Sequence, residues 1–179
     1  LNSRAGKFTT TMAILLFLVA IGSTVSSTNA QSTNSIESDR GTYATFQDAI
    51  DDSQDGDVLT VTSGTHIGNF VITKSIAIIG IGWPVFDGGG DDNVITVEAS
   101  NVVISGLVIQ NSGDTLNSED AGIEVNAPNV TIEGNRIQDT LFGVYLKQAP
   151  FGMIRNNVIT GMDLEVQRRG DGIRVWYSS

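Results

Sequence analysis

The feature that most constrains this chain is an internal repeat of short segments punctuated by glycine and asparagine. Three of them superimpose: VVISGLVIQN (102–111), VTIEGNRIQD (130–139) and GMIRNNVITG (152–161). A second series runs in step and comprises NVITV (93–97), AGIEV (121–125), FGVYL (142–146) and DGIRV (171–175). The alternation of apolar and polar residues is typical of β-strands, and no unit can bury its apolar side unless its neighbours stack on it.

Stacking the units predicts columns of inward-facing apolar residues. These are Ile78, Ile104, Ile132 and Ile154; Ile109, Ile137 and Ile159; Phe70, Ile95, Ile123, Val144 and Ile173; and Ile72, Val97, Val125, Leu146 and Val175. A unit is as short as the 22 residues from Ile132 to Ile154, which leaves no room for a helix in each repeat or for a propeller blade. We therefore predict an all-β protein, a right-handed parallel β-helix, whose hand follows from strand twist and the crossover rule.

Two sets of residues are assigned to the turns of this solenoid. Asn135 and Asn157 occupy equivalent positions, which predicts a ladder of side-chain hydrogen bonds, with asparagine tolerating a left-handed backbone. Gly122, Gly143 and Gly172 align where strands of the second series begin, so we expect the backbone geometry there to require glycine.

The rest of the chain divides by composition. Residues 1–30 read as a cleaved signal peptide, with a basic start, the apolar run 12–22 and small residues before Gln31. The polar residues 31–42 are predicted to be a flexible lead-in, 43–57 a capping helix and 58–179 the β-helix. We expect further rungs after Ser179, because the last repeat otherwise leaves a strand edge unpaired.

The net charge of the chain restricts the kinds of partner that it can bind. Without residues 1–30, 8 basic residues face 20 acidic ones, a formal net charge of −12 that argues against nucleic acid and anionic lipid as partners. From Lys147 onward, however, five basic residues outnumber three acidic ones. The chain has no cysteine, so an exported form must be stable without disulfides.

The basic excess coincides with aromatic residues that the repeat turns outward. One outward row is Thr96, Glu124, Tyr145 and Arg174, and the next contains Lys147 and Trp176. Tyr145, Lys147, Arg174 and Trp176 are thus predicted to cluster on one face as a contact surface for a sugar, an anionic ligand or a protein. Ordinary surface packing is the alternative. A third row places Glu133 beside Arg155 as a surface ion pair.

The stretch RRGDGIRVW (168–176) adds two further candidates. Arg169-Gly170-Asp171 is a tripeptide known from adhesion ligands, but the repeat places it across the junction between a loop and a strand, so we interpret it as a coincidence. Arg168 and Arg169 are not required by the fold, and we predict that they contact a ligand or a partner.

Catalytic and metal sites are not predicted. Acidic residues gather in two loops, Asp87, Asp91 and Asp92 in one and Asp114, Glu119 and Asp120 in the other, where a sugar-cleaving enzyme would need paired carboxylates. Acids in such loops are also common as solvated turn residues. With one histidine, His66, no cysteine and the scattered Met153 and Met162, we expect no metal site and no cofactor in this segment.

Several motifs carry a family resemblance. Residues 45–80 look like the opening of many pectate-lyase-like β-helix proteins. More specifically, the chain resembles the NosD family through VISGLVIQNSGDT (103–115), EDAGIEV (119–125), LFGVYLKQAP (141–150), IRNNVITG (154–161) and RRGDGIRVW (168–176), in that order.

That resemblance implies an exported, periplasmic, copper-binding β-helix without established catalytic residues. It implies a non-enzymatic role in maturing the copper site of nitrous oxide reductase, with an ABC transporter and the reductase as partners, and with the membrane reached only through them. The residues show no convincing copper ligands. The wider superfamily implies the alternative, a secreted protein that binds or cleaves carbohydrate, and a surface interaction scaffold is a third reading.

Overall fold

The computed structural model describes residues 35–62 and 64–178. The predicted signal peptide, and the first residues of the predicted lead-in, lie outside the described residues. In the part of the chain that the structure describes, no helix has the length and apolar character needed to cross a membrane.

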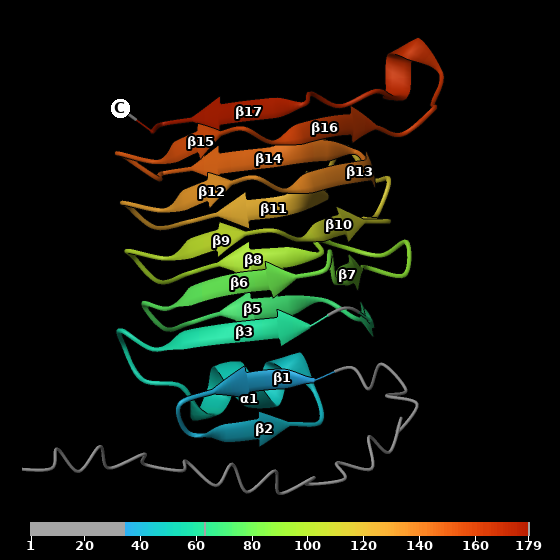
Figure 1. Ribbon diagram of the computed structural model, residues 1–179. Helices are drawn as coiled ribbons and strands as arrows, with labels where there is room; N and C mark the ends of the chain where they lie inside the picture. The colour runs from blue at the N-terminus through green and yellow to red at the C-terminus, as the bar shows by residue number, and fades with distance from the viewer. Residues whose placement is uncertain (1–34, 63, 179) are drawn as a thin grey trace, which may run out of the picture. The chain divides into compact units, whose positions relative to one another are not determined.

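Three parallel sheets build the body of the protein, and each turn of chain adds one strand to each sheet (Figure 1). Sheet A contains β3 (Val58–Thr62), β6 (Ala77–Ile81), β9 (Val103–Ser105), β12 (Thr131–Glu133) and β15 (Met153–Arg155). Sheet B contains β4 (Thr65–Ile67), β7 (Val85–Asp87), β10 (Val108–Gln110), β13 (Arg136–Thr140) and β16 (Val158–Gly161). Sheet C contains β5 (Phe70–Ile72), β8 (Ile95–Val97), β11 (Ala121–Val125), β14 (Phe142–Lys147) and β17 (Ile173–Trp176). The predicted parallel β-helix is confirmed.

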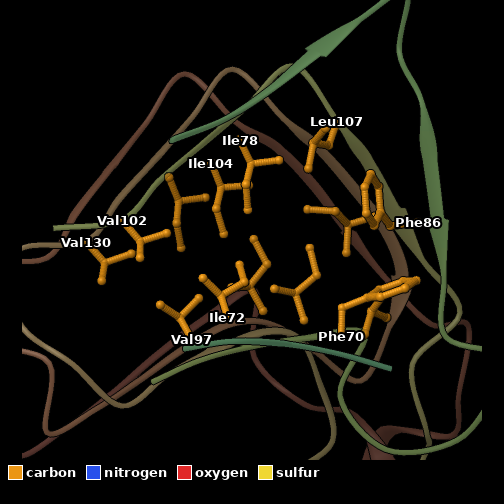
Figure 2. Packing of buried hydrophobic residues seen from close by; sticks show 14 of the residues in the cluster. Phe70, Ile72, Ile78, Phe86, Val97, Val102, Ile104, Leu107 and Val130 are labelled. Carbon is orange, nitrogen blue, oxygen red and sulfur yellow. The ribbon is translucent and has the colours of Figure 1, made fainter. Parts of the chain in front are cut away.

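The strand registers confirm the predicted columns. Ile78, Ile104, Ile132 and Ile154 pair in sequence across sheet A, Ile109, Ile137 and Ile159 across sheet B, and both longer columns across sheet C. The columns line the inside of the solenoid, where residues such as Ile72, Ile78 and Ile104 pack together (Figure 2), but Ile173 and Val175 on the last rung are about half exposed. Side chains of one column repeat about every 4.8 Å, so the core is continuous from rung to rung.

The first rung is capped by α1 (Phe46–Asp52). Its N-cap is Thr45, whose Oγ1 accepts a hydrogen bond from the Asp48 amide at 3.2 Å and so satisfies a free donor of the first turn. Phe46, Ala49 and Ile50 are buried against the core, as their helical spacing predicts. The helix is shorter than the predicted 43–57, because the backbone is already extended at its C-cap, Ser53, which has a φ of −68° and a ψ of 155°.

The predicted flexible lead-in is wrong for the residues that the structure describes. β1 (Ile36–Ser38) and β2 (Gly41–Tyr43) form an antiparallel hairpin, and β1 also pairs antiparallel with β3 (Figure 1). Ile36 is fully buried in the core. Ile36, a lone apolar residue within a polar stretch, thus anchors the hairpin together with Tyr43, and the hairpin covers the edge of sheet A.

The asparagine ladder is confirmed, with one correction. Asn157 Oδ1 accepts hydrogen bonds from the Asn135 amide at 2.9 Å and from Asn135 Nδ2 at 3.1 Å. Asn135 continues the ladder downward by accepting from the Leu107 amide at 3.1 Å. The left-handed residues, however, are Gly134 (φ 64°) and Asn156 (φ 56°), each one position earlier. The ladder asparagines are therefore selected for their amide groups and not for their backbone.

Gly122 and Gly143 are required by close approach between rungs. A Cβ on Gly122 would lie 2.8 Å from Ile137 Cγ2 and 2.9 Å from the Gly143 carbonyl oxygen. A Cβ on Gly143 would overlap Ile159 Cγ2 and the Gly172 carbonyl oxygen. At Gly172 the nearest atom would be Ile159 Cγ2 at 3.8 Å, which is ordinary contact. The geometric requirement predicted for all three glycines therefore holds for two of them.

Candidate contact site

The outer face of sheet C carries the predicted aromatic and basic residues. β11, β14 and β17 align Glu124 with Tyr145 and Tyr145 with Arg174, and Lys147 pairs with Trp176 on the last two strands. The structure therefore brings together the four residues that the repeat predicts. Arg168 and Arg169 lie in and after the 3₁₀ helix η1 (Val166–Arg168), in the loop that joins β16 to β17.

Tyr145 is not exposed, which corrects its prediction as a contact residue. Its side chain is 1% exposed and belongs to a second apolar cluster outside the solenoid. That cluster also contains Ala121, Leu141 and Phe142, with Met162 and Leu164 packed against it. The β16–β17 loop supplies Met162 and Leu164, so this loop closes over the outer face of sheet C and covers the tyrosine.

The charged neighbours of Tyr145 are balanced. Glu119 forms ion pairs with Arg174 at 3.1 Å and Lys147 at 3.6 Å. The Arg174 guanidinium lies 5.2 Å from the centroid of the Tyr145 ring, and Lys147 Nζ lies 5.6 Å from it. Burial raises the pKa of Tyr145, and its hydrogen bond to Glu119 raises it further. The phenol therefore stays protonated, and the cluster fixes the surface without presenting a reactive group.

Arg168 and Arg169 face two separate hollows. Arg168 forms an ion pair with Asp114 and lines a hollow of about 290 Å³ with Thr115, Leu116 and Asn117. Arg169 donates from Nε to the Leu164 carbonyl oxygen at 2.7 Å and lines a hollow of about 350 Å³. The other residues around that hollow are Leu141, Gly161, Met162, Asp163, Leu164, Gly170 and Gly172.

Four of the predicted contact residues remain accessible. The side chains of Arg168 and Arg169 are each about half exposed, Lys147 is only slightly less so, and Trp176 stands edge-on to Tyr177 with 5.1 Å between ring centroids. Arg174 is more covered because it lies over the rings of Phe142 and Tyr145. We call Lys147, Arg168, Arg169 and Trp176 the basic surface. Its cationic and aromatic groups suit a protein or an anionic ligand.

The acidic loops are built as turns. Asp87 accepts hydrogen bonds from the Gly89 amide, Gln110 Nε2 and Asn111 Nδ2 at 2.8–2.9 Å. Burial acts to raise the pKa of Asp87, but these hydrogen bonds outweigh it and lower the pKa. A carboxylate held ionised by three donors stabilises a turn and is a poor general acid.

The structure also joins the two acidic loops, which their sequence separation does not reveal. Asp120 is almost fully buried and accepts from the Thr115 amide at 2.9 Å. Burial raises its pKa most; the hydrogen bond from the Thr115 amide opposes this shift, and the negative charges of Asp92, Asp91 and Asp114 add to it. Because the Asp120 carboxyl is enclosed by its own loop, it has no open face toward a substrate.

The described residues do not fit a copper site. The single histidine, His66, is buried between the rings of Phe46 and Phe86, and Met153 and Met162 belong to different parts of the surface. Within residues 35–62 and 64–178, no group of three or more His, Cys, Asp or Glu side chains is placed to hold a metal ion. Soft or imidazole ligands are what copper selects, and they are not gathered here.

One feature at sheet B, away from the strands of the contact site, was missed in the sequence. Arg136 of β13 lies over the ring of Trp83, with 4.0 Å from the guanidinium carbon to the ring centroid. Trp83 sits in the turn before β7 with a φ of 62°, and its ring is partly exposed. The repeat predicts that Arg136 points outward, but Trp83 lies in a turn outside the repeat pattern, so the sequence does not predict their contact.

Comparison with known proteins supports a distant NosD-like relationship. The chain is 29% identical over 120 residues to a protein of Pseudomonas aeruginosa described as a probable ABC transporter binding protein NosD, a match that covers 65% of this chain and 28% of that protein. It is 27% identical over 106 residues to a cell surface glycoprotein of Methanothermus fervidus, covering 58% of this chain and 17% of that protein. The chain spans less than a third of the length of either relative. No family model and no solved structure matches it.

Proposed function

We propose that this protein is an exported, non-enzymatic β-helix that acts as an accessory to an ABC transporter. The observation that carries the proposal is the 120-residue similarity to the Pseudomonas protein, whose description names transporter binding. The finer proposal, from the NosD resemblance, is a role in maturing the copper site of nitrous oxide reductase.

The geometry supports a role exercised through contacts and not through chemistry. The buried cluster around Tyr145 holds the basic surface in place, and the carboxylates of the acidic loops are occupied by turns. Since the described residues do not fit copper, the proposed maturation role operates through protein partners and assigns no metal-handling step to these residues.

Co-purification tests the proposed function. A C-terminally tagged full-length protein would be recovered from gently solubilised membranes of the source organism, and the associated proteins would be identified by mass spectrometry. We expect the subunits of an ABC transporter to co-purify and the protein to reside in the extracytoplasmic fraction. Recovery of the exported protein without any transporter subunit would contradict the proposal.

Carbohydrate binding is the second candidate, and the stacked Trp83 and Arg136 favour it. An exposed indole gives a sugar ring an apolar face, and a nearby guanidinium can pair with a uronic-acid carboxylate. This reading predicts retention on a uronic-acid polymer that is lost in Trp83→Ala. Cleavage of such a polymer, abolished by replacing Asp87, Asp91 and Asp92 with asparagine, would replace our main proposal with an enzymatic one.

A further inference from the structure

Asn129-Val130-Thr131 is the single Asn-x-Ser/Thr sequence in this chain, and its middle residue is not proline. Such a tripeptide is the acceptor for N-linked glycans in exported proteins, where it has to lie on an exposed loop. We propose that Asn129 is an N-glycosylation site, an inference that rests on the export proposed above but not on the transporter role.

The structure places Asn129 at the tip of an exposed turn between β11 and β12. Its φ is 59°, so the residue adopts a left-handed conformation that asparagine tolerates. The Asn129 backbone amide is engaged, donating to the Pro150 carbonyl oxygen at 3.0 Å. Within the described residues its side-chain amide has no hydrogen-bond partner, so Nδ2 is free to be modified without breaking a contact.

The neighbouring rung supplies a natural comparison. Asn101 occupies the same turn position, with a φ of 58° and its amide donating to the Pro128 carbonyl oxygen at 3.3 Å. Asn101 is also exposed, but Val103 stands where the acceptor sequence requires Ser or Thr. Thr131 and Val103 pair directly across sheet A. The two turns therefore have similar backbone conformations, but only the turn at Asn129 is followed by the threonine that an acceptor sequence requires.

The rung above adds an apolar surface beside the acceptor. Phe151 holds the equivalent turn position with a φ of 62° and is 80% exposed. The hydrogen bond from Asn129 to Pro150 places this phenylalanine at the adjacent turn. A sugar attached to Asn129 can lie with its apolar face on the phenyl ring, which gives this largely exposed aromatic side chain a partner.

The group transfer requires a glycan activated on a lipid phosphate and an oligosaccharide transferase. Asn129 Nδ2 attacks the anomeric carbon of the first sugar and forms the N-glycosidic bond as the bond from that carbon to the phosphate oxygen breaks. The electron pair of the broken bond leaves with the lipid phosphate, which gains one negative charge. The proton released from Nδ2 balances that charge. The side chain changes from a primary to a secondary amide, and no oxidant or reductant takes part.

Peptide mass spectrometry of the full-length protein from its source organism tests the site. We expect the wild-type peptide containing Asn129 to carry a glycan and the peptide containing Asn101 to be unmodified. Thr131→Val should remove the glycan, and Val103→Thr should add one to Asn101. Each substitution installs the residue found at the paired position of the neighbouring rung, so both variants should retain the fold, as circular dichroism would verify.

The outcomes separate this inference from the export on which it depends. An exported wild-type protein with an unmodified Asn129 would overturn the glycosylation site and leave export standing. A glycan that persists in Thr131→Val would overturn the assignment to this acceptor. A protein found in the cytoplasm with residues 1–30 attached would overturn both the inference and the proposed export.

Discussion

Asn157 Oδ1 accepts two hydrogen bonds from Asn135, one from its backbone amide and one from its side-chain amide. Asn135 is almost fully buried and also donates to the Ile104 carbonyl oxygen at 3.0 Å. The pair therefore joins consecutive rungs at the corner between sheets A and B, where the backbone has no strand partner. A buried amide of this kind stabilises a turn because it satisfies backbone groups that have no strand partner.

Asn135→Ala should lower the free energy of unfolding by at least about 2 kcal/mol, since it leaves the Leu107 amide without its partner inside the protein. Asn157→Ala is the matched comparison, because Asn157 is only half-buried and water can replace part of what it loses. Urea denaturation of both variants measures the difference. Equal losses for the two variants would show that burial does not determine the strength of the ladder.

Gly143→Ala should cost about 1–3 kcal/mol, because the added methyl group overlaps the Gly172 carbonyl oxygen and Ile159. Gly172→Ala is the matched control, since its methyl group would meet only Ile159 at ordinary contact distance. Thermal unfolding of the two variants provides the comparison. A Gly143→Ala protein as stable as wild type would mean that the rungs separate more easily than this packing implies.

His66 should make the capped end of the solenoid sensitive to mild acid. Burial lowers the pKa of His66 below its ordinary value of 6.5, and its Nε2 has no hydrogen-bond partner in the described residues. The folded state thus favours neutral imidazole, so this contribution to stability is present above pH 6.5 and is lost as the pH falls toward the lower folded pKa.

The test is the midpoint of urea unfolding between about pH 7.5 and 5.5, a range in which histidine is the side chain that ordinarily titrates. We expect the wild-type midpoint to fall across this range and that of His66→Phe to stay level, because phenylalanine keeps an aromatic ring beside Phe46 and Phe86 without a titrating nitrogen. Parallel pH profiles for the two proteins would assign the acid sensitivity to another group.

Tyr145→Ala should destabilise the protein by about 3–5 kcal/mol, as expected for removing a large buried aromatic side chain. Tyr145→Phe should cost about 1 kcal/mol, because it removes only the hydrogen bond to Glu119. Since the ring is covered, Tyr145→Phe should leave partner binding unchanged. Loss of binding in a fully folded Tyr145→Phe protein would restore this residue as a direct contact.

The repeat made the solenoid predictable because inward positions such as Ile104 and Ile132 recur at equivalent places, and stacking then determines their register. The sequence did not reveal the β1–β2 hairpin, since Ile36 is a lone apolar residue in a polar stretch. Nor did it reveal that Tyr145 is covered, because the β16–β17 loop packs through Met162 and Leu164 without any periodic pattern. Ladders follow from a period, whereas loops depend on tertiary contacts.

The outward-facing residues of sheet C were therefore predictable, but the ion pairs that hold them were not. Lys147, Arg174 and Trp176 lie where the outward alternation places them, and the Glu133–Arg155 ion pair forms at 2.5 Å as expected. The ion pairs from Glu119 to Lys147 and Arg174 join residues that no sequence spacing connects. The most accessible residues of the basic surface are Arg168, Arg169 and Trp176.

Binding of the purified protein to the ABC transporter of its own organism, reconstituted in lipid nanodiscs, tests the central claim most directly. We expect wild type to bind, and the double variant Arg169→Ala with Trp176→Ala to bind at least about tenfold more weakly, a change of about 1.4 kcal/mol. Trp83→Ala, in the turn before β7 of sheet B, should bind like wild type. Absence of binding by folded wild-type protein would contradict the accessory role.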